Sequence, residues 1–128
     1  MGDLRLRRLG TFKPGEYEDL HIVATVARGI REHGAAFAAW AELHDAEESM
    51  LLAFSDAYLG EYESAQAWAE VVIEELGIQA RIDAALPEDL ARYVHIDSEA
   101  WAHDAWLNGD IHIIHKPDGG VWIFDTRP

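Results

Sequence analysis

Apolar residues recur every three or four positions along most of the chain, and this pattern predicts a series of short amphipathic helices. The clearest apolar stripe runs from Trp68 to Leu76, and Ser64 precedes it as a favourable N-cap. Gly34 and Gly77 mark two expected helix ends. The expected helices cover about residues 17–33, 35–43, 45–58, 64–76, 87–93 and 98–108.

Two local patterns set boundaries within this series. Asp45 and Glu48 have the spacing of a capping box, in which the two side chains satisfy backbone N–H groups at a helix start. This pair predicts the beginning of the third helix, which residues 59–62 are expected to break. Pro87 suits the first turn of the fifth helix, because its fixed φ and missing N–H are tolerated there.

Residues 111–126 alternate in the manner of a β-hairpin, with strands at 111–116 and 121–126 and a Pro-Asp-Gly-Gly turn between them. Both faces of this hairpin are partly apolar. A two-stranded ribbon is marginal alone. We therefore expect helices to cover one face, and a third strand or a second subunit to cover the other. The two apolar sets are Ile111, Ile113, Val121 and Ile123 on one face, and Ile114, Trp122 and Phe124 on the other.

Together these elements predict a mainly helical α+β fold. A small helical domain is followed by helices packed on a C-terminal β-hairpin or small antiparallel sheet. The expected domains are a basic N-terminal segment at 1–15 that ends in a loop, a helical domain at 16–62, and an α+β domain at 63–128.

Charge is distributed unevenly along the chain, which has 24 acidic and 10 basic side chains in 128 residues and a formal net charge of −14. Residues 1–31 carry six basic and four acidic side chains, whereas residues 32–128 carry four basic and twenty acidic ones. The segment between Arg31 and Arg81 contains eleven carboxylates and no Lys or Arg. A surface selected for solubility alone normally intersperses both signs. The sequence therefore predicts a concentrated acidic surface.

Several classes of function are excluded by what the sequence lacks. The absence of cysteine excludes disulfides, thiolate metal sites and a cysteine nucleophile. There is no apolar run of the roughly 20 residues that a membrane span needs, and the N-terminus has no signal-peptide pattern. We therefore expect a soluble cytoplasmic protein with no membrane partner.

Catalytic and metal motifs are also missing. His112 and His115 are three apart on an expected strand, so they point to opposite faces and cannot share an ion. No serine lies in a nucleophile elbow, and Gly119 and Gly120 belong to a hairpin turn and not to a phosphate loop. We expect no enzymatic activity, no metal and no cofactor. Nucleic acid is not an expected partner either, because the acidic field after residue 32 repels phosphate.

The acidic helix that follows Ser64 suggests what the charge is for. Glu70 and Glu74 form a like-charge pair at i, i+4, which costs about 0.2–0.5 kcal/mol. Such carboxylates stand roughly 6 Å apart at a rise of about 1.5 Å per residue. Several helices of this kind side by side approach the charge density of a duplex, with one phosphate per about 1.7 Å of axis. Such a surface would compete for the basic groove of a DNA-binding enzyme.

Charge alone leaves another interpretation open. Acid-rich proteins with few lysines also arise through halophilic adaptation or compositional bias, and this chain has only two Lys. By itself the charge favours a solvated acidic surface without a specific partner. Halophilic acidity should be spread evenly, however, whereas here it is concentrated after Arg31.

Four segments occur in order over about residues 15–125: Gly-Glu-Tyr-Glu-Asp-Leu at 15–20, Phe-Ser-Asp-Ala-Tyr-Leu-Gly-Glu-Tyr-Glu-Ser at 54–64, the run from Leu-Pro-Glu-Asp-Leu at 86 to Leu-Asn-Gly-Asp-Ile at 111, and Gly-Gly-Val-Trp-Ile-Phe at 119–124. Together they resemble the ArdA-type antirestriction proteins. The resemblance implies an inhibitor of type I restriction–modification enzymes, carried by a phage or mobile element. Members of the family are elongated dimers that imitate bent B-form DNA and occupy the DNA-binding groove of the methyltransferase core.

The resemblance also implies which residues form the DNA-mimic surface, and it places the first two thirds of residues 86–111 near the subunit contacts of a homodimer. Family members carry an N-terminal α/β domain before the segment at 15–20, whereas only about fifteen residues, which are basic, precede that segment here. The chain is therefore expected to be a short member that lacks this domain, or a relative that retains the last two domains alone. The alternative function is an acidic interaction module that inhibits another basic DNA-binding protein. The expected surface residues are Glu47, Glu48, Asp56, Glu61, Glu63, Glu70, Glu74, Glu75, Glu88, Asp89, Asp97, Glu99, Asp104 and Asp110.

Overall fold

The computed structural model describes residues 16–128, which form eight helices and a three-stranded antiparallel sheet. The prediction of a mainly helical α+β fold is confirmed. The chain divides into two compact units between Asp56 and Ala57. The expected basic segment at 1–15, with its terminal loop, lies outside the described residues.

The N-terminal unit contains α2 (Glu16–His33), α3 (Ala35–Leu43), α4 (Glu48–Leu52) and most of α5 (Phe54–Ala57). The first two helices lie where the sequence predicts them. Gly34 separates them with a φ of 74°, which a residue without a Cβ adopts readily.

An aromatic cluster forms the core of this unit. Phe37, Trp40 and Phe54 are all buried, and the rings of Phe37 and Phe54 lie 5.1 Å apart between centroids. The indole N–H of Trp40 donates to the Met50 carbonyl at 2.6 Å, so its burial leaves no donor unsatisfied. α2 approaches α3 closely at Gly29, where an added Cβ would lie 2.3 Å from the Phe37 ring.

The expected capping box at Asp45 and Glu48 is wrong. Asp45 and Ala46 have φ values of 52° and 55°, whereas an N-cap residue takes an extended backbone. α4 therefore begins at Glu48 after Glu47, whose side chain makes no capping hydrogen bond. The expected helix is also divided, since α4 ends at Leu52 and α5 is a separate turn of four residues.

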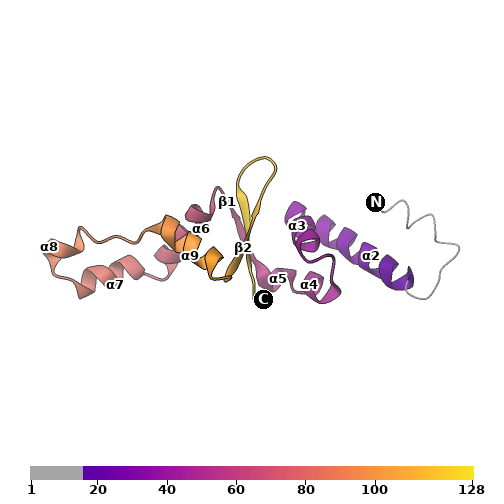
Figure 1. Cartoon of the computed structure of the whole chain (residues 1–128), viewed down its shortest axis with the longest axis horizontal. Helices are drawn as coiled ribbons and strands as arrows, with labels where there is room; N and C mark the ends of the chain where they lie inside the picture. The colour runs from indigo at the N-terminus through magenta and orange to yellow at the C-terminus, as the bar shows by residue number, and fades with distance from the viewer. Residues whose placement is uncertain (1–15) are drawn as a thin grey trace. The chain divides into compact units, whose positions relative to one another are not determined.

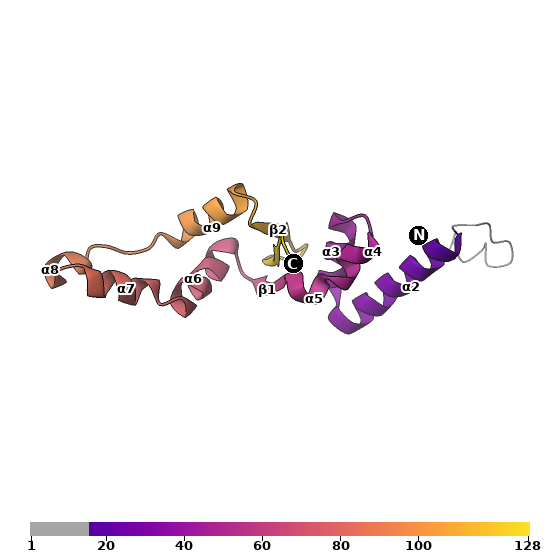
Figure 2. The same cartoon turned by 90° about the horizontal axis from the view of Figure 1, so that it is seen from below.

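The C-terminal unit is built on a sheet with the strand order β1-β3-β2. The chain leaves the sheet along α6 and α7, turns at α8 and returns through an extended segment to α9, a path that can be followed in Figures 1 and 2. α6 and α9 pack against each other. The elements are β1 (Tyr58–Tyr62), α6 (Ala65–Glu75), α7 (Ile78–Ala85), α8 (Glu88–Ala91), α9 (Ser98–Leu107), β2 (Ile111–His115) and β3 (Val121–Asp125).

Strand β1 occupies residues that were expected only to break a helix. It pairs with β3, and the register shifts between Tyr58 and Gly60. Gly60 has a φ of 126°, a backbone conformation that favours glycine at such an irregularity. The predicted hairpin is confirmed by the pairing of β2 with β3. β1 extends the hairpin into a three-stranded sheet by pairing with the edge of β3, so it does not cover an apolar face of the hairpin.

Helix α7 was not predicted. The sequence predicts a helix end at Gly77, and α6 does end there. Gly77, whose backbone is left-handed (φ 64°), is also the N-cap of α7, which begins at the next residue. None of the residues of α7 is fully buried. Its only apolar pattern, Ile78 and Ile82 at i, i+4, is too short to indicate a helix by periodicity.

The core of the C-terminal unit lies between the sheet and the two packed helices. Ile123 is fully buried at its centre, and Val121 and Ile111 flank it on the same face of the sheet. Trp68 and Ile73 of α6 close this face. The core is therefore assembled from segments far apart in sequence, and it fixes which faces of α6 and α9 point outward.

Candidate functional site: an acidic surface

All fourteen acidic residues that the sequence singled out are exposed. Three of them belong to the N-terminal unit and eleven to the C-terminal unit, where the structure brings most of them onto α6, α8, α9 and their ends. The eleven are Glu61, Glu63, Glu70, Glu74, Glu75, Glu88, Asp89, Asp97, Glu99, Asp104 and Asp110.

α6 presents its carboxylates because its opposite face is held in the core. The Ser64 hydroxyl accepts a hydrogen bond from the Ala67 N–H at 3.1 Å, as the sequence predicted for an N-cap, and such caps stabilise a helix by about 1 kcal/mol. Trp68 and Ile73 are buried. Glu70 and Glu74 therefore project to solvent, one helical turn apart.

α9 adds carboxylates beside those of α6. Asp97 caps the helix by accepting a hydrogen bond from the Ala100 N–H at 3.0 Å. At the same end, the Ser98 hydroxyl accepts from the Gln66 side chain at 3.1 Å and donates to Glu70 at 3.5 Å. The start of α9 is thus tied to the middle of α6, and acidic residues from two helices lie side by side.

Cations do little to offset this charge. In residues 57–128, which the structure describes throughout, there are fourteen acidic side chains and four Lys or Arg. Of those four, only Lys116 lies within ion-pair distance of a carboxylate. Arg92 instead places its guanidinium over the Tyr93 ring, 5.0 Å from the centroid. The carboxylates of α6 and α9 consequently face solvent without a cation of their own.

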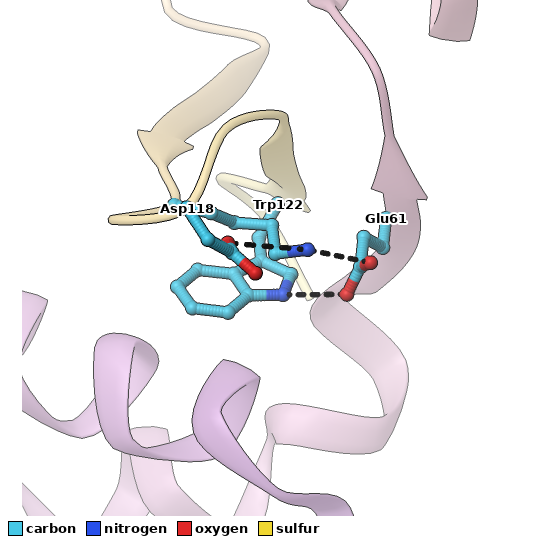
Figure 3. A network of polar contacts seen from close by, with 4 residues as sticks. Glu61, Asp118 and Trp122 are labelled. Carbon is cyan, nitrogen blue, oxygen red and sulfur yellow. Dashed lines mark hydrogen bonds and ion pairs between the residues drawn. The ribbon is translucent and has the colours of Figure 1, made fainter.

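Glu61 is the exception, because it belongs to a polar network at the edge of the sheet. Lys116 donates to Glu61 at 2.7 Å, and the indole N–H of Trp122 donates to the other carboxylate oxygen at 3.2 Å. Asp118 lies 3.7 Å from the same ammonium group. Figure 3 shows Glu61, Asp118 and Trp122 converging from β1, the hairpin turn and β3.

The contacts of this network shift the pKa values of its ionisable groups. The hydrogen bond from Lys116 is the largest influence on Glu61 and lowers the pKa of its carboxyl, and the bond from Trp122 acts in the same direction. The same contact raises the pKa of Lys116 above 10.5. Burial, followed by the charge of Glu61, raises the pKa of Tyr58 above 10.0. Glu61 and Lys116 are therefore both charged at neutral pH, and each is matched to the other.

Two acidic residues of the N-terminal unit also have local partners. Glu48 contacts His21 through its carboxylate, and Glu47 accepts a hydrogen bond from the Ser49 hydroxyl at 2.8 Å. The third, Asp56, is exposed at the end of the unit. Glu47 and Glu48 therefore have side-chain partners within their own unit, as Glu61 does in the C-terminal unit.

Histidines do not gather into a metal site within residues 16–128, where no three His, Asp or Glu side chains are arranged to hold an ion. His112 and His115 lie opposite Phe124 and Val121 in the sheet, hence on opposite faces. Over the same part of the chain, no helix is long and apolar enough to cross a membrane.

The family model of antirestriction proteins (ArdA) matches residues 5–117, which is most of the chain. The chain belongs to this family. Neither the curated proteins nor the solved structures yield a match. The antirestriction family is a family of inhibitors, so membership implies antirestriction activity and interaction with restriction–modification enzymes.

Some features of this antirestriction protein could not be found from its sequence. Asp83 is exposed on α7 and adds to the acidic surface, but it was not considered because α7 itself was not predicted. The pairing of Glu61 with Lys116 joins residues 55 positions apart, and no local pattern reports it. A possible signal was Lys116 itself, the only lysine after Lys13.

Proposed function

We propose that this chain is a DNA mimic that occupies the DNA-binding groove of the methyltransferase core of a type I restriction–modification enzyme. One observation carries the proposal. The exposed carboxylates of α6 and α9 lie on adjoining helices without Lys or Arg partners among the described residues of the C-terminal unit. A groove built to hold phosphates supplies the cations that this surface lacks.

Spacing supports the match to DNA. Glu70 and Glu74 are one turn apart on α6, about 6 Å along its axis. α9 contributes Glu99 and Asp104 from the neighbouring helix. Carboxylates from two adjoining helices provide a higher density of charge than one helix alone, and a duplex carries about one charge per 1.7 Å. The fold holds these charges in place because both helices are anchored in the same core.

A binding experiment with a DNA-free type I methyltransferase tests this function. We expect the full chain to bind it, to be displaced by duplex DNA, and to lose affinity steeply as salt rises, because pairing with a basic groove dominates. Simultaneous binding of the chain and DNA, or affinity independent of salt, would overturn the proposal. Binding only to a different basic DNA-binding protein would favour the alternative of a general acidic inhibitor.

We also propose that the functional form is a homodimer. Leu90, Tyr93 and Val94 are 52%, 73% and 40% exposed around α8, and contiguous exposed apolar residues indicate an interaction site. A second copy of the chain would bury them. Sedimentation at micromolar concentration should give a dimer that Tyr93→Glu dissociates, and a monomeric wild-type protein would contradict this proposal.

A further inference from the structure

A cleft of about 500 Å³ opens between α6, α7 and the segment that leads into α9. Its volume falls within the range of pockets that hold ligands, roughly 300–1,000 Å³. Ile73 and Ile96 give it an apolar lining. Glu70 and Glu74 stand at its side, and none of the described residues that line it is basic. The cleft thus combines an apolar surface with two carboxylates.

The walls of the cleft are tied together by hydrogen bonds. The Gln79 side chain donates to the Val94 carbonyl at 2.9 Å, which fastens α7 to the returning segment, and its bond to Asp83 at 3.1 Å within α7 holds the amide in place. On the other side, Ser98 bridges Gln66 and Glu70. These contacts fix the positions of α6, α7 and the start of α9 relative to one another, so the cleft between them is part of the fold.

Local electrostatics favours a cation in this cleft. The C-terminal half of α6 forms one wall, and its last turn contains no basic residue that would offset the negative end of the helix dipole. The positive end of α9, which also faces this region, is already capped by the Asp97 carboxylate. Glu70 and Glu74 add two full negative charges one turn apart.

We propose that this cleft receives an arginine side chain of the basic partner. Arginine joins an apolar stem to a planar guanidinium with five N–H donors, and it retains its charge when partly desolvated. The stem would pack on Ile73 and Ile96 while the guanidinium bonds the carboxylates of Glu70 and Glu74. This inference rests on the proposed function, because it assigns one of the contacts through which the acidic surface binds a restriction–modification enzyme.

Filling the cleft without changing its charge tests the inference. Ala80 lines the cleft and is exposed, whereas Ala84 lies on the same helix outside it. We expect Ala80→Phe to weaken binding to a DNA-free type I methyltransferase by about tenfold or more, as for the loss of an interface hot spot, while Ala84→Phe binds as wild type. Equal binding by the two variants overturns the inference.

A second pair of variants covers the case in which Ala80→Phe fails to fold. Glu74 lines the cleft, and Glu75 is its neighbour outside. Glu74→Gln and Glu75→Gln remove the same charge, so we expect Glu74→Gln to weaken binding several-fold more. Equal losses would show that charge alone acts and would overturn the assignment of a cleft contact.

A probe that needs no enzyme separates this inference from the proposed function. Titration of the full chain with N-acetylarginine amide, followed by NMR, should shift the backbone amides of Gly77, Ala80 and Ser98 in wild type and not in Ala80→Phe. N-acetyllysine amide should shift them less. No shift, or an equal response to both amides, overturns the arginine assignment. A clear arginine response with no binding to the methyltransferase would instead reject the proposed function.

Discussion

The edge of the sheet and the outer face of α6 carry the same residue type in opposite surroundings. At the sheet edge, Glu61 receives hydrogen bonds from Lys116 and Trp122, and its pKa is lowered mainly by the bond from Lys116. On α6, Glu70 receives only a long bond from the Ser98 hydroxyl, and Glu74 has no cation among the described residues.

The difference lies in what each carboxylate faces. Glu61 lies opposite Trp122 in the ladder between β1 and β3, where Lys116 from the start of the hairpin turn reaches it. Glu70 and Glu74 lie on α6, which makes no ion pair with a lysine or arginine among the described residues. Arg81 on the adjoining α7 is not within ion-pair distance of either carboxylate. Exposure and charge alone therefore do not identify a binding residue. An acidic residue already matched within the chain stabilises the fold, whereas an unmatched one is available to a partner.

Neutralising the unmatched carboxylates should have the largest effect. We expect the combined change of Glu63, Glu70 and Glu74 to Gln to weaken binding to a DNA-free type I methyltransferase by about 10- to 100-fold, because close charge pairs at interfaces are coupled by about 1.5 kcal/mol or more. The fold should remain intact. Binding measured at several salt concentrations should also show a shallower salt dependence.

The matched control for this variant changes three acids of the N-terminal unit that lie outside the expected surface. Glu32, Glu42 and Asp45 are exposed, and their conversion to amides gives the same net charge. This control should bind nearly as wild type. A loss as large as that of the first variant would show that total charge matters and that the position of the carboxylates does not.

Removing the matched carboxylate should instead affect stability. Glu61→Leu leaves both the Lys116 ammonium and the Trp122 N–H without their acceptor, and Trp122 is buried, so we expect Tm to fall by several degrees. Glu61→Gln keeps an oxygen for Trp122 and should cost less. Both should bind the methyltransferase much better than the α6 variant. Unchanged Tm in both would show that the network does not stabilise the fold.

The effect of Glu61→Gln should also depend on pH. A carboxyl whose folded pKa is lowered contributes its stability above the unfolded pKa and loses it as pH falls through the folded value. Lys116, with its raised pKa, stays charged throughout this range. The Tm difference between wild type and variant should thus be largest near pH 7 and shrink below about pH 4. A constant difference down to pH 3 would contradict this assignment.

Local sequence signals were enough to predict α6 and the hairpin. Ser64 as an N-cap and the apolar stripe after it placed α6 and its outward carboxylates correctly, because both signals act within one or two turns. The alternation at 111–126 placed the hairpin for the same reason. The exposure of the α6 carboxylates could therefore be predicted from the sequence.

The edge strand β1 and its polar contacts could not be predicted, because they join residues that are far apart in the sequence. Residues 59–62 contain Gly60 and are predicted only to break a helix that ends at about Tyr58, yet residues 58–62 form a strand once β3 is available to pair with them. The pairing of Glu61 with Lys116 follows only from that ladder. The cleft could not be predicted for the same reason, because its walls come from three separate segments: α6, the unpredicted α7 and the segment before α9.

The smallest effect expected is a gain in stability on α6. Glu70 and Glu74 repel each other at i, i+4, and neither forms an ion pair with a lysine or arginine among the described residues. Either Glu70→Gln or Glu74→Gln should therefore raise the free energy of unfolding by about 0.2–0.5 kcal/mol at low salt. The gain should vanish at high salt, where exposed charges are screened. Urea unfolding at two salt concentrations measures it. A loss of stability would mean that these carboxylates support the fold as Glu61 does, and the distinction between the two regions would fail.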